Sequence, residues 1–209
     1  MAAPRHTRRA VLAWTLLTPA AALAQGRPKV VTMLGDSITA GYGLQPDQAW
    51  PAALQRLLDQ SGYKYKVENR GTSGATTKDA AAHVNTMIEA HPFLVIVEFG
   101  GNDGLRGLPP DQTRKNLDTV LTTLEAAHIK VLLAGITLPP NYGPDYIQAF
   151  DKSFRDLAVK HHVTFIPMIY KDLINVPGTI QQDGIHPTAK GSEIIARTIL
   201  PRLTPLLRK

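Results

Sequence analysis

Short, strongly apolar runs alternate along this chain with longer segments in which apolar residues recur every three or four positions. Apolar runs rich in β-branched and aromatic side chains are typical of strands. The run at 93–99 is almost continuously apolar, as in a central strand covered on both faces, whereas the run at 65–69 is more polar, as at a sheet edge. The predicted strands are residues 29–34, 65–69, 93–99, 130–136 and 163–167.

Helical periodicity follows each of these strands. After the first strand, Trp50, Leu54 and Leu58 fall on one side of a helix, and Gly62 follows as a stop signal. In the last helix, the prolines at 201 and 205 predict interruptions, because proline has no N–H to donate to the helical ladder. The predicted helices are residues 50–58, 77–90, 110–128, 146–160 and 188–207.

The regular alternation of strands and helices, without tandem hairpin signals, indicates an α/β sandwich built on a parallel sheet. Sheets of this kind bind ligands at the carboxyl ends of their strands. Three polar, glycine-rich loops follow the first three predicted strands, at 35–37, 69–74 and 100–103. We therefore expect these loops to share one edge of the sheet.

Composition is that of one globular domain. The chain has 209 residues, 44% of them hydrophobic, which is enough for one full core. Of the net charge of +6, three positive charges lie at Arg5, Arg8 and Arg9. No basic stripe with interleaved aromatic residues follows, so nucleic acid is not an expected partner. The chain has no cysteine, which excludes disulfides, thiolate metal sites and a cysteine nucleophile.

The first 24 residues have the pattern of an export signal. Three arginines precede an apolar stretch at 11–17, and small residues at 20–24 offer a cleavage site after Ala24. The stretch is short and is broken by Thr18-Pro19, which argues against a membrane-spanning helix. We expect residues 1–24 to be removed and residues 25–209 to form a single exported domain, periplasmic or secreted, without a membrane anchor.

The export route is left open, because the paired arginines in residues 7–12 also occur in twin-arginine signals. The alternative, an amphipathic N-terminal helix that belongs to the fold, is disfavoured because no acidic residue precedes Asp36.

Ser37 is the candidate nucleophile. It follows a buried strand directly, at the edge where chemistry is expected. A serine hydroxyl needs a base, a group that orients the base, and donors for the developing negative charge. Of seven histidines, only His186 lies in a loop with a nearby carboxylate, Asp183, three residues before it. The other reading is that Asp183 only supports a turn and that His186 is solvated.

Four blocks together resemble the SGNH, or GDSL-type, hydrolase family, closest to its bacterial arylesterase, acyl-CoA thioesterase I and lysophospholipase L1 branch. They are Gly35-Asp36-Ser37, Gly74, Gly100-x-Asn102-Asp103 and Asp183-x-x-His186. The resemblance covers essentially the whole chain after residue 24. It implies a three-layer sandwich with a central five-stranded parallel sheet, flavodoxin-like in topology.

The resemblance also implies the roles of these residues. Ser37 would be the nucleophile, His186 the base and Asp183 the residue that orients the base. The oxyanion hole would consist of the backbone N–H groups of Ser37 and Gly74 and the side-chain amide of Asn102. Esters, thioesters and lysophospholipids would be substrates, no cofactor or metal would be needed, and the protein would be a monomer. Asp36 and Asp103, next to the motif residues, are expected to brace their loops.

Two loops are expected to border an acyl pocket, since both mix apolar residues with glycine and proline. The alternative is that these loops only cover the edge of the sheet. The predicted pocket residues are Leu105, Arg106, Leu108, Pro139 and Tyr142.

Three other functions compete with the esterase hypothesis. Some relatives of this fold remove acetyl groups from carbohydrates, but the only tryptophans are Trp14 and Trp50, so the sequence shows no extended sugar-stacking surface. A non-catalytic exported binding module, or more remotely a flavoprotein, could use the same scaffold. Such a module would tolerate loss of the serine or the histidine, yet both are present.

Overall fold

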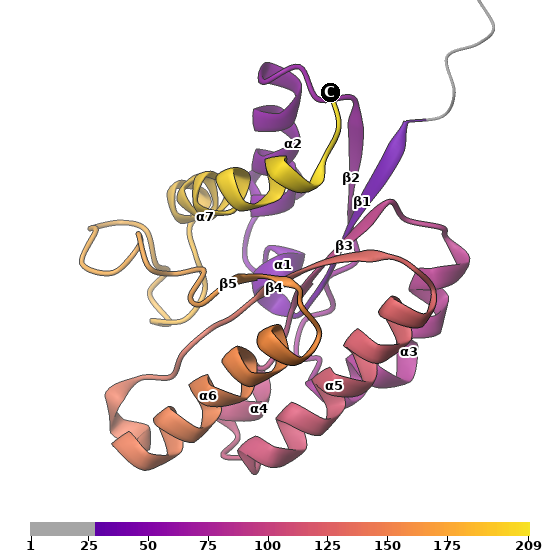
Figure 1. Ribbon diagram of the computed structural model, residues 1–209. Helices are drawn as coiled ribbons and strands as arrows, with labels where there is room; N and C mark the ends of the chain where they lie inside the picture. The colour runs from indigo at the N-terminus through magenta and orange to yellow at the C-terminus, as the bar shows by residue number, and fades with distance from the viewer. Residues whose placement is uncertain (1–27) are drawn as a thin grey trace, which may run out of the picture.

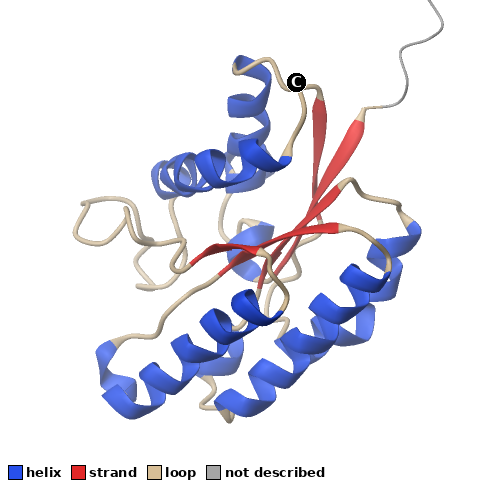
Figure 2. Ribbon diagram, viewed as in Figure 1, coloured by secondary structure: helices blue, strands red, loops and turns tan. Residues whose placement is uncertain are grey.

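A single parallel sheet forms the centre of the molecule. The computed structural model describes residues 28–209, so the predicted export signal at 1–24 lies outside the described residues. All pairings between neighbouring strands are parallel, and the strand order is β2-β1-β3-β4-β5 (Figure 2). The predicted fold class is therefore confirmed. The strands are β1 (Lys29–Gly35), β2 (Tyr65–Asn69), β3 (Leu94–Glu98), β4 (Lys130–Ala134) and β5 (Thr164–Ile166).

Helices cover both faces of this sheet (Figure 1). Helices α2 and α7 pack together on one face, and α3, α5 and α6 form the layer on the other. Two very short helices, α1 and α4, begin where β1 and β3 end. The helices are α1 (Ser37–Ala40), α2 (Trp50–Gln60), α3 (Thr77–Glu89), α4 (Gly101–Leu105), α5 (Pro110–Ala126), α6 (Pro144–Lys160) and α7 (Ala189–Leu203), with 3-10 turns η1 (Pro46–Gln48), η2 (Pro140–Tyr142) and η3 (Thr204–Leu206).

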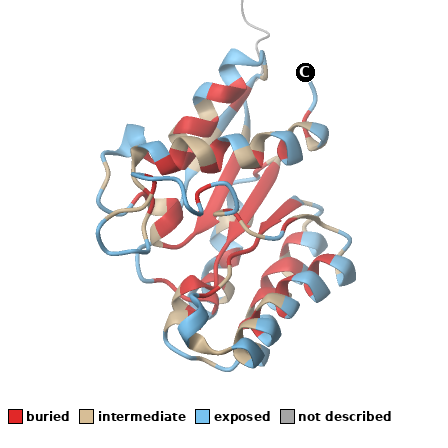
Figure 3. Cartoon of the chain, turned by 90° about the vertical axis from the view of Figure 1, so that its left-hand side faces the viewer, coloured by how far each residue is buried: buried red, intermediate tan, exposed pale blue. Residues whose placement is uncertain are grey.

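Burial along the strands follows their positions in the sheet. Every residue of the central strand β3 is buried, whereas β2, at the edge, alternates between buried, half-buried and exposed residues. Figure 3 shows the buried strands as a continuous layer between the helices. The sequence expectation of a central third strand and a second strand at the edge is thus confirmed. Gly35 pairs with Glu98, so β1 and β3 end at the same level and deliver their loops to one edge.

Of the two interruptions predicted in the last helix, the one near Pro205 is confirmed, because α7 ends at Leu203 and a 3-10 turn follows, but the one at Pro201 was wrong. Helix α7 does not break at Pro201 but continues to Leu203. A proline removes only one bond from the ladder, and here an apolar stripe holds the helix against the core on both sides of it. Ile195, Ile199 and Leu203 in this stripe are all fully buried. Packing of that stripe outweighs the lost hydrogen bond.

Four histidines lie directly after helices. His91, His128 and His162 have positive φ angles directly after helices, where the chain reverses. His161 differs, because its ring contacts Asp118 and Glu125 of α5, at 2.6 and 3.1 Å. This contact ties α6 to α5 and involves partners more than 35 residues away, which local spacing does not reveal. Among the helices of residues 28–209, none is long and apolar enough to cross a membrane.

Candidate active site

Ser37 stands at the start of α1, immediately after the buried end of β1. Asp36 caps this helix, because its Oδ1 accepts a hydrogen bond of 2.9 Å from the N–H of Ile38. The helix then ends at once at Gly41, whose φ of 81° is left-handed. A strand, a cap and a single turn therefore hold Ser37 half-exposed at the carboxyl edge of the sheet.

His186 lies in a closed turn before α7. The chain pairs with itself at Ile180 and Pro187, and the N–H of Gln181 donates to the carbonyl of His186 at 2.8 Å. Inside this turn, Asp183 Oδ1 accepts the backbone N–H groups of Ile185 and His186, at 2.9 and 3.0 Å. Thr188 caps α7 by accepting from the N–H of Gly191.

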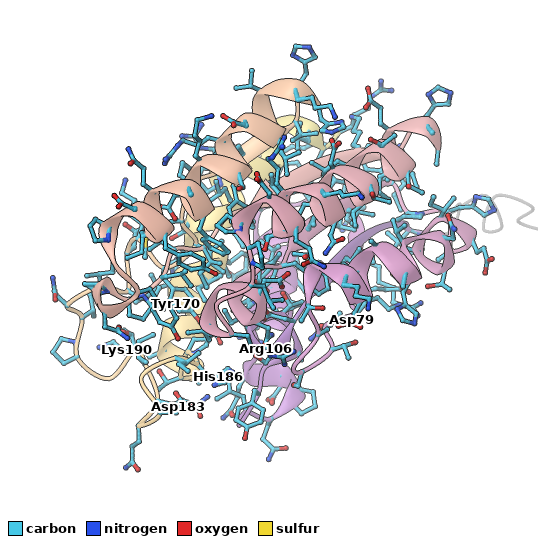
Figure 4. The ribbon with its side chains drawn as sticks, turned by 90° about the horizontal axis from the view of Figure 1, so that it is seen from below. Asp79, Arg106, Tyr170, Asp183, His186 and Lys190 are labelled. Carbon is cyan, nitrogen blue, oxygen red and sulfur yellow. The ribbon has the colours of Figure 1, made fainter. Side chains whose placement is uncertain are left out.

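The two loops bring three side chains into one hydrogen-bonded row. His186 Nε2 lies 2.8 Å from Ser37 Oγ, and His186 Nδ1 lies 2.7 Å from Asp183 Oδ2. Figure 4 shows His186 and Asp183 projecting from their loop. The interpretation in which Asp183 only supports a turn is incomplete. Its Oδ1 supports the turn, but its Oδ2 contacts the imidazole ring of His186.

Asp183 is held in its ionised form. Partial burial raises its pKa, but the hydrogen bonds with His186 and with the backbone N–H groups of Ile185 and His186 outweigh this and bring it to about 2. Asp183 therefore carries a negative charge beside the ring at any pH near neutrality. Asp183 Oδ2 is placed to accept a proton from His186 Nδ1, which leaves Nε2 turned toward Ser37.

Gly74 and Asn102 lie on the neighbouring loops, after β2 and β3. Gly74 has a φ of 79°, which favours glycine, and its missing side chain leaves its backbone open to close approach. The Asn102 amide nitrogen donates to the carbonyl of Ala75 at 2.9 Å and, at a longer 3.3 Å, to Asp36 Oδ2. The amide thus has one firmly held N–H and one that is weakly held.

The two aspartates beside the motif residues brace loops, as their position suggested. Asp103 is buried and accepts from the N–H and the hydroxyl of Thr77, which fixes the start of α3. Asp36 is 1% exposed, and its burial raises its pKa to about 6, against the opposing effects of the Ile38 N–H and the charge of His186.

The five predicted pocket residues lie in the loops after β3 and β4, which hydrogen bonds join to each other and to the β2 loop. Arg106 donates to the carbonyl of Gly74 at 3.0 Å, so it bridges the loops after β3 and β2 (Arg106 is labelled in Figure 4). Tyr142 donates to the carbonyl of Leu105 at 2.9 Å, and Leu108 is tied by Tyr146. Pro139, the fifth, is exposed at the end of the β4 loop. Their role as an acyl pocket stays a prediction.

Two hollows lie beside these loops and the turn that carries His186, although none of the five predicted pocket residues lines either of them. One of about 660 Å³ lies between α3 and the β2 loop, with Leu34, Met87 and Phe99 in its lining. The other, of about 390 Å³, is mainly apolar and is lined by the segment that leads to Gly184. The first is lined by residues of β1, the β2 loop, α3 and the end of β3, which no local pattern in the sequence brings together. The second is lined by the single stretch 168–184, to which sequence reasoning assigned no role.

Three supporting residues were missed by sequence reasoning. The Gln181 amide donates to the carbonyls of Tyr42 and Pro187, at 2.8 and 2.9 Å. It thereby joins the loop that follows α1 to the turn that carries His186. The Tyr42 ring lies 4.5 Å from that of His186, centre to centre. Tyr170 donates to the carbonyl of Ile185 at 3.0 Å. Of these three residues, Tyr42 alone lies near a candidate nucleophile in the sequence, five positions after Ser37.

The strand order and this set of loops define an SGNH hydrolase. The chain belongs to the GDSL-like Lipase/Acylhydrolase family, whose model matches residues 33–194. It is accordingly a hydrolase of carboxylic esters.

Named relatives extend over nearly the whole chain. Esterase TesA of Pseudomonas aeruginosa is 40% identical over 197 residues, which cover 94% of this chain and 96% of the relative. Thioesterase 1/protease 1/lysophospholipase L1 of Escherichia coli K12 is 38% identical over 193 residues, 92% of this chain and 89% of the relative. A crystal structure of TesA, 40% identical, superposes with a TM-score of 0.83 and covers 86% of this chain and 100% of its own.

Proposed function

We propose that this protein hydrolyses acyl esters and thioesters through a covalent acyl-enzyme on Ser37, with His186 as general base and Asp183 as its orienting partner. The observation that carries the proposal is the 2.8 Å contact between His186 Nε2 and Ser37 Oγ. It lies within the distance at which a base can take the proton of a nucleophile.

In the first half-reaction, Ser37 Oγ attacks the carbonyl carbon while its proton moves to His186 Nε2. The ring becomes an imidazolium, whose second N–H faces the Asp183 carboxylate at 2.7 Å. The tetrahedral intermediate then collapses, the bond to the leaving group breaks, and His186 returns the proton to the departing alcohol or thiol. Ser37 is left as an acyl ester.

The negative charge on the carbonyl oxygen of the intermediate needs donors. Those that we infer are the backbone N–H groups of Ser37 and Gly74 and the weakly held N–H of Asn102. The Asn102 amide nitrogen lies 3.3 Å from Asp36 Oδ2, which is a long and weak hydrogen bond. Little stabilisation is therefore lost when this N–H turns to a developing oxyanion. Its other N–H remains anchored to Ala75, which keeps the amide in place.

The second half-reaction repeats the first with water. His186 takes a proton from water, the resulting hydroxide attacks the acyl carbon, and Ser37 leaves with the proton from His186. The products are a carboxylic acid and the free enzyme. No further group is required to balance either half-reaction.

The expected substrates carry an apolar acyl chain. Esterase, thioesterase and lysophospholipase are among the activities in the names of the two relatives, the second of which also includes protease. Three exposed apolar side chains also lie near the turn that carries His186, at Tyr42, Ile174 and Ile185. For carbohydrate deacetylation, by contrast, we find no supporting feature, since Trp50 is fully buried and is the only tryptophan in the part that the structure describes.

We also infer that the protein is exported and that residues 1–24 are removed, which rests on the sequence of that segment. Sequencing the amino terminus of the exported protein, which should begin at Gln25, tests this.

A p-nitrophenyl phosphonate ester tests the proposed function directly. It should phosphonylate one residue per chain, release p-nitrophenol stoichiometrically, and inactivate the enzyme toward p-nitrophenyl butyrate. Intact-mass and peptide analysis should place the adduct on Ser37. Labelling elsewhere, or hydrolysis that survives complete labelling of Ser37, would overturn the assignment.

Replacing Asn102 with alanine should lower kcat for p-nitrophenyl butyrate by about 10²–10³-fold, the usual effect of losing one oxyanion donor. KM should change little, because this donor acts mainly on the charge of the transition state. Steady-state kinetics measure both values. Asn85→Ala is a matched control, since Asn85 is exposed on α3, outside the loops that carry Ser37, Gly74 and Asn102. Equal effects of the two substitutions would contradict the oxyanion role.

A further inference from the structure

A buried acid lies directly beneath the turn that carries Ser37. Glu98 is the last residue of β3 and is 1% exposed. Its Oε2 accepts a hydrogen bond of 2.7 Å from the hydroxyl of Thr39, which is itself fully buried in α1. Thr39 is two residues beyond Ser37, so Glu98 contacts the same single helical turn as the nucleophile.

Thr39 is held on two sides. While Glu98 accepts from its hydroxyl, Asn69 at the end of β2 donates to its carbonyl at 2.9 Å. The strands on either side of β1 therefore each contribute one hydrogen bond to this residue. Together they fix the turn against rotation about the end of β1.

The packing of this contact explains the glycine of the Gly-Asp-Ser block. A Cβ placed on Gly35 would lie 2.1 Å from Thr39 Oγ1 and 2.9 Å from the carbonyl oxygen of Glu98. Neither distance is sterically possible. The Thr39 side chain thus occupies the space that Gly35 leaves free, and Ser37 lies on the turn between them.

Stability alone does not account for a carboxyl group at this position. Burial, with a further contribution from the charge of Asp36, raises the pKa of Glu98 well above its ordinary value, although the hydrogen bond from the Thr39 hydroxyl opposes this. Within residues 28–209, its second oxygen, Oε1, has no hydrogen-bond partner. A buried polar group of this kind destabilises the fold, so its presence calls for another explanation.

We propose that Glu98 is a positioning residue for the nucleophile: by accepting from Thr39 it fixes the turn that places the hydroxyl and the backbone N–H of Ser37. The inference rests on the proposed function and deepens it. Glu98 touches no reacting atom. It acts through Thr39 on the distance between Ser37 and His186 and on one donor of the oxyanion hole.

Thr39→Val tests the inference, because valine keeps the shape of threonine and removes only the hydroxyl. We expect kcat for p-nitrophenyl butyrate to fall about tenfold or more, the equivalent of one buried hydrogen bond, with KM within about twofold of wild type. Thr39→Ser, which keeps the hydroxyl, should restore most of the lost kcat. A change confined to KM or to stability would contradict a positioning role.

Thr32→Val is the matched control. Thr32 is also buried in this region, on β1, but its hydroxyl has no partner among the described residues. Its substitution should leave kcat unchanged. Should Thr39→Val fail to fold, Glu98→Gln against Glu98→Leu gives the same test, because glutamine keeps the carbonyl acceptor and leucine does not. Glutamine should retain most of kcat, and leucine should not.

The phosphonate separates the two ways in which this inference can fail. If the wild-type enzyme is not labelled at Ser37, the proposed function fails. If the wild type is labelled and Thr39→Val reacts at the same rate with equal kcat, the proposed function stands and the role of Glu98 is refuted.

Discussion

The Ser37→Ala variant should lose essentially all ester hydrolysis, with kcat for p-nitrophenyl butyrate lowered by roughly 10⁶-fold, as for other serine hydrolases that lose their nucleophile. In the part of the chain that the structure describes, the hydroxyl that His186 Nε2 contacts is Ser37 Oγ, so the substitution removes the group that would accept the acyl chain. Stopped-flow and steady-state assays would measure both the burst of p-nitrophenol and the turnover.

The fold of this variant should remain intact. Ser37 is only half-buried, and the cap of α1 comes from Asp36 and not from the serine. The free energy of unfolding in urea should therefore stay within about 0.5 kcal/mol of wild type. Ser61→Ala, at the exposed end of α2, is the control and should keep full activity. A Ser37→Ala enzyme that retains a tenth of wild-type turnover would exclude Ser37 as nucleophile.

Asp183→Asn has the second-largest expected effect, a loss in kcat of about 10⁴-fold with little structural change. Asparagine can still accept the backbone N–H groups of Ile185 and His186 through its carbonyl oxygen. Its amide nitrogen, however, would donate to His186 Nδ1 where Asp183 Oδ2 now accepts at 2.7 Å. The ring would then carry its proton on Nε2 and could not take the proton of Ser37.

A second aspartate–histidine pair supplies the control for this variant. Asp118 contacts His161 at 2.6 Å on the helical layer of α5 and α6, away from the loops that carry Ser37. Asp118→Asn should therefore leave kcat unchanged. Comparable losses in both variants would indicate a general effect on folding and would count against the role of Asp183.

Acid unfolding adds an independent readout for Asp183. Because the folded state lowers the pKa of Asp183 from 3.8 to about 2, its ionised form stabilises the fold above about pH 4, and this contribution is lost as the pH falls toward 2. The asparagine variant lacks it. Between pH 5 and pH 2.5 the variant should therefore lose less stability than wild type in urea titrations. An identical pH dependence of the two proteins would contradict the contact with His186.

Some of the site could be predicted because its signals are local. A serine directly after an apolar run, and a histidine three residues after an aspartate, can each be read within one short window of sequence. His161 shows the limit of this approach. Its acidic partners belong to a different helix, so nothing near it in the sequence marked the pair. The same holds for Gln181, which donates a hydrogen bond to the carbonyl of Tyr42, 139 positions earlier in the chain.

Glu98 illustrates a second limit. In the sequence it closes an apolar run and could be read as the polar residue that ends a strand. Its role depends on the register of β1 and β3, which places it beside Gly35. Register is set by packing across the sheet and not by any single strand. Pro201 shows the reverse case, in which the local rule for proline was overridden by the buried stripe on α7.

By itself, the sequence determined the order of strands and helices, the parallel sheet, the edge that carries the loops, and the identity of Ser37, Asp183 and His186 as candidates. These follow from periodicity and from short motifs, which are local properties of the chain. Only the tertiary structure decided that Ser37 and His186, 149 positions apart, lie 2.8 Å from each other. It also decided that Glu98 and Asn69 contact Thr39, in the turn that carries Ser37, because such contacts exist only once neighbouring strands are in register.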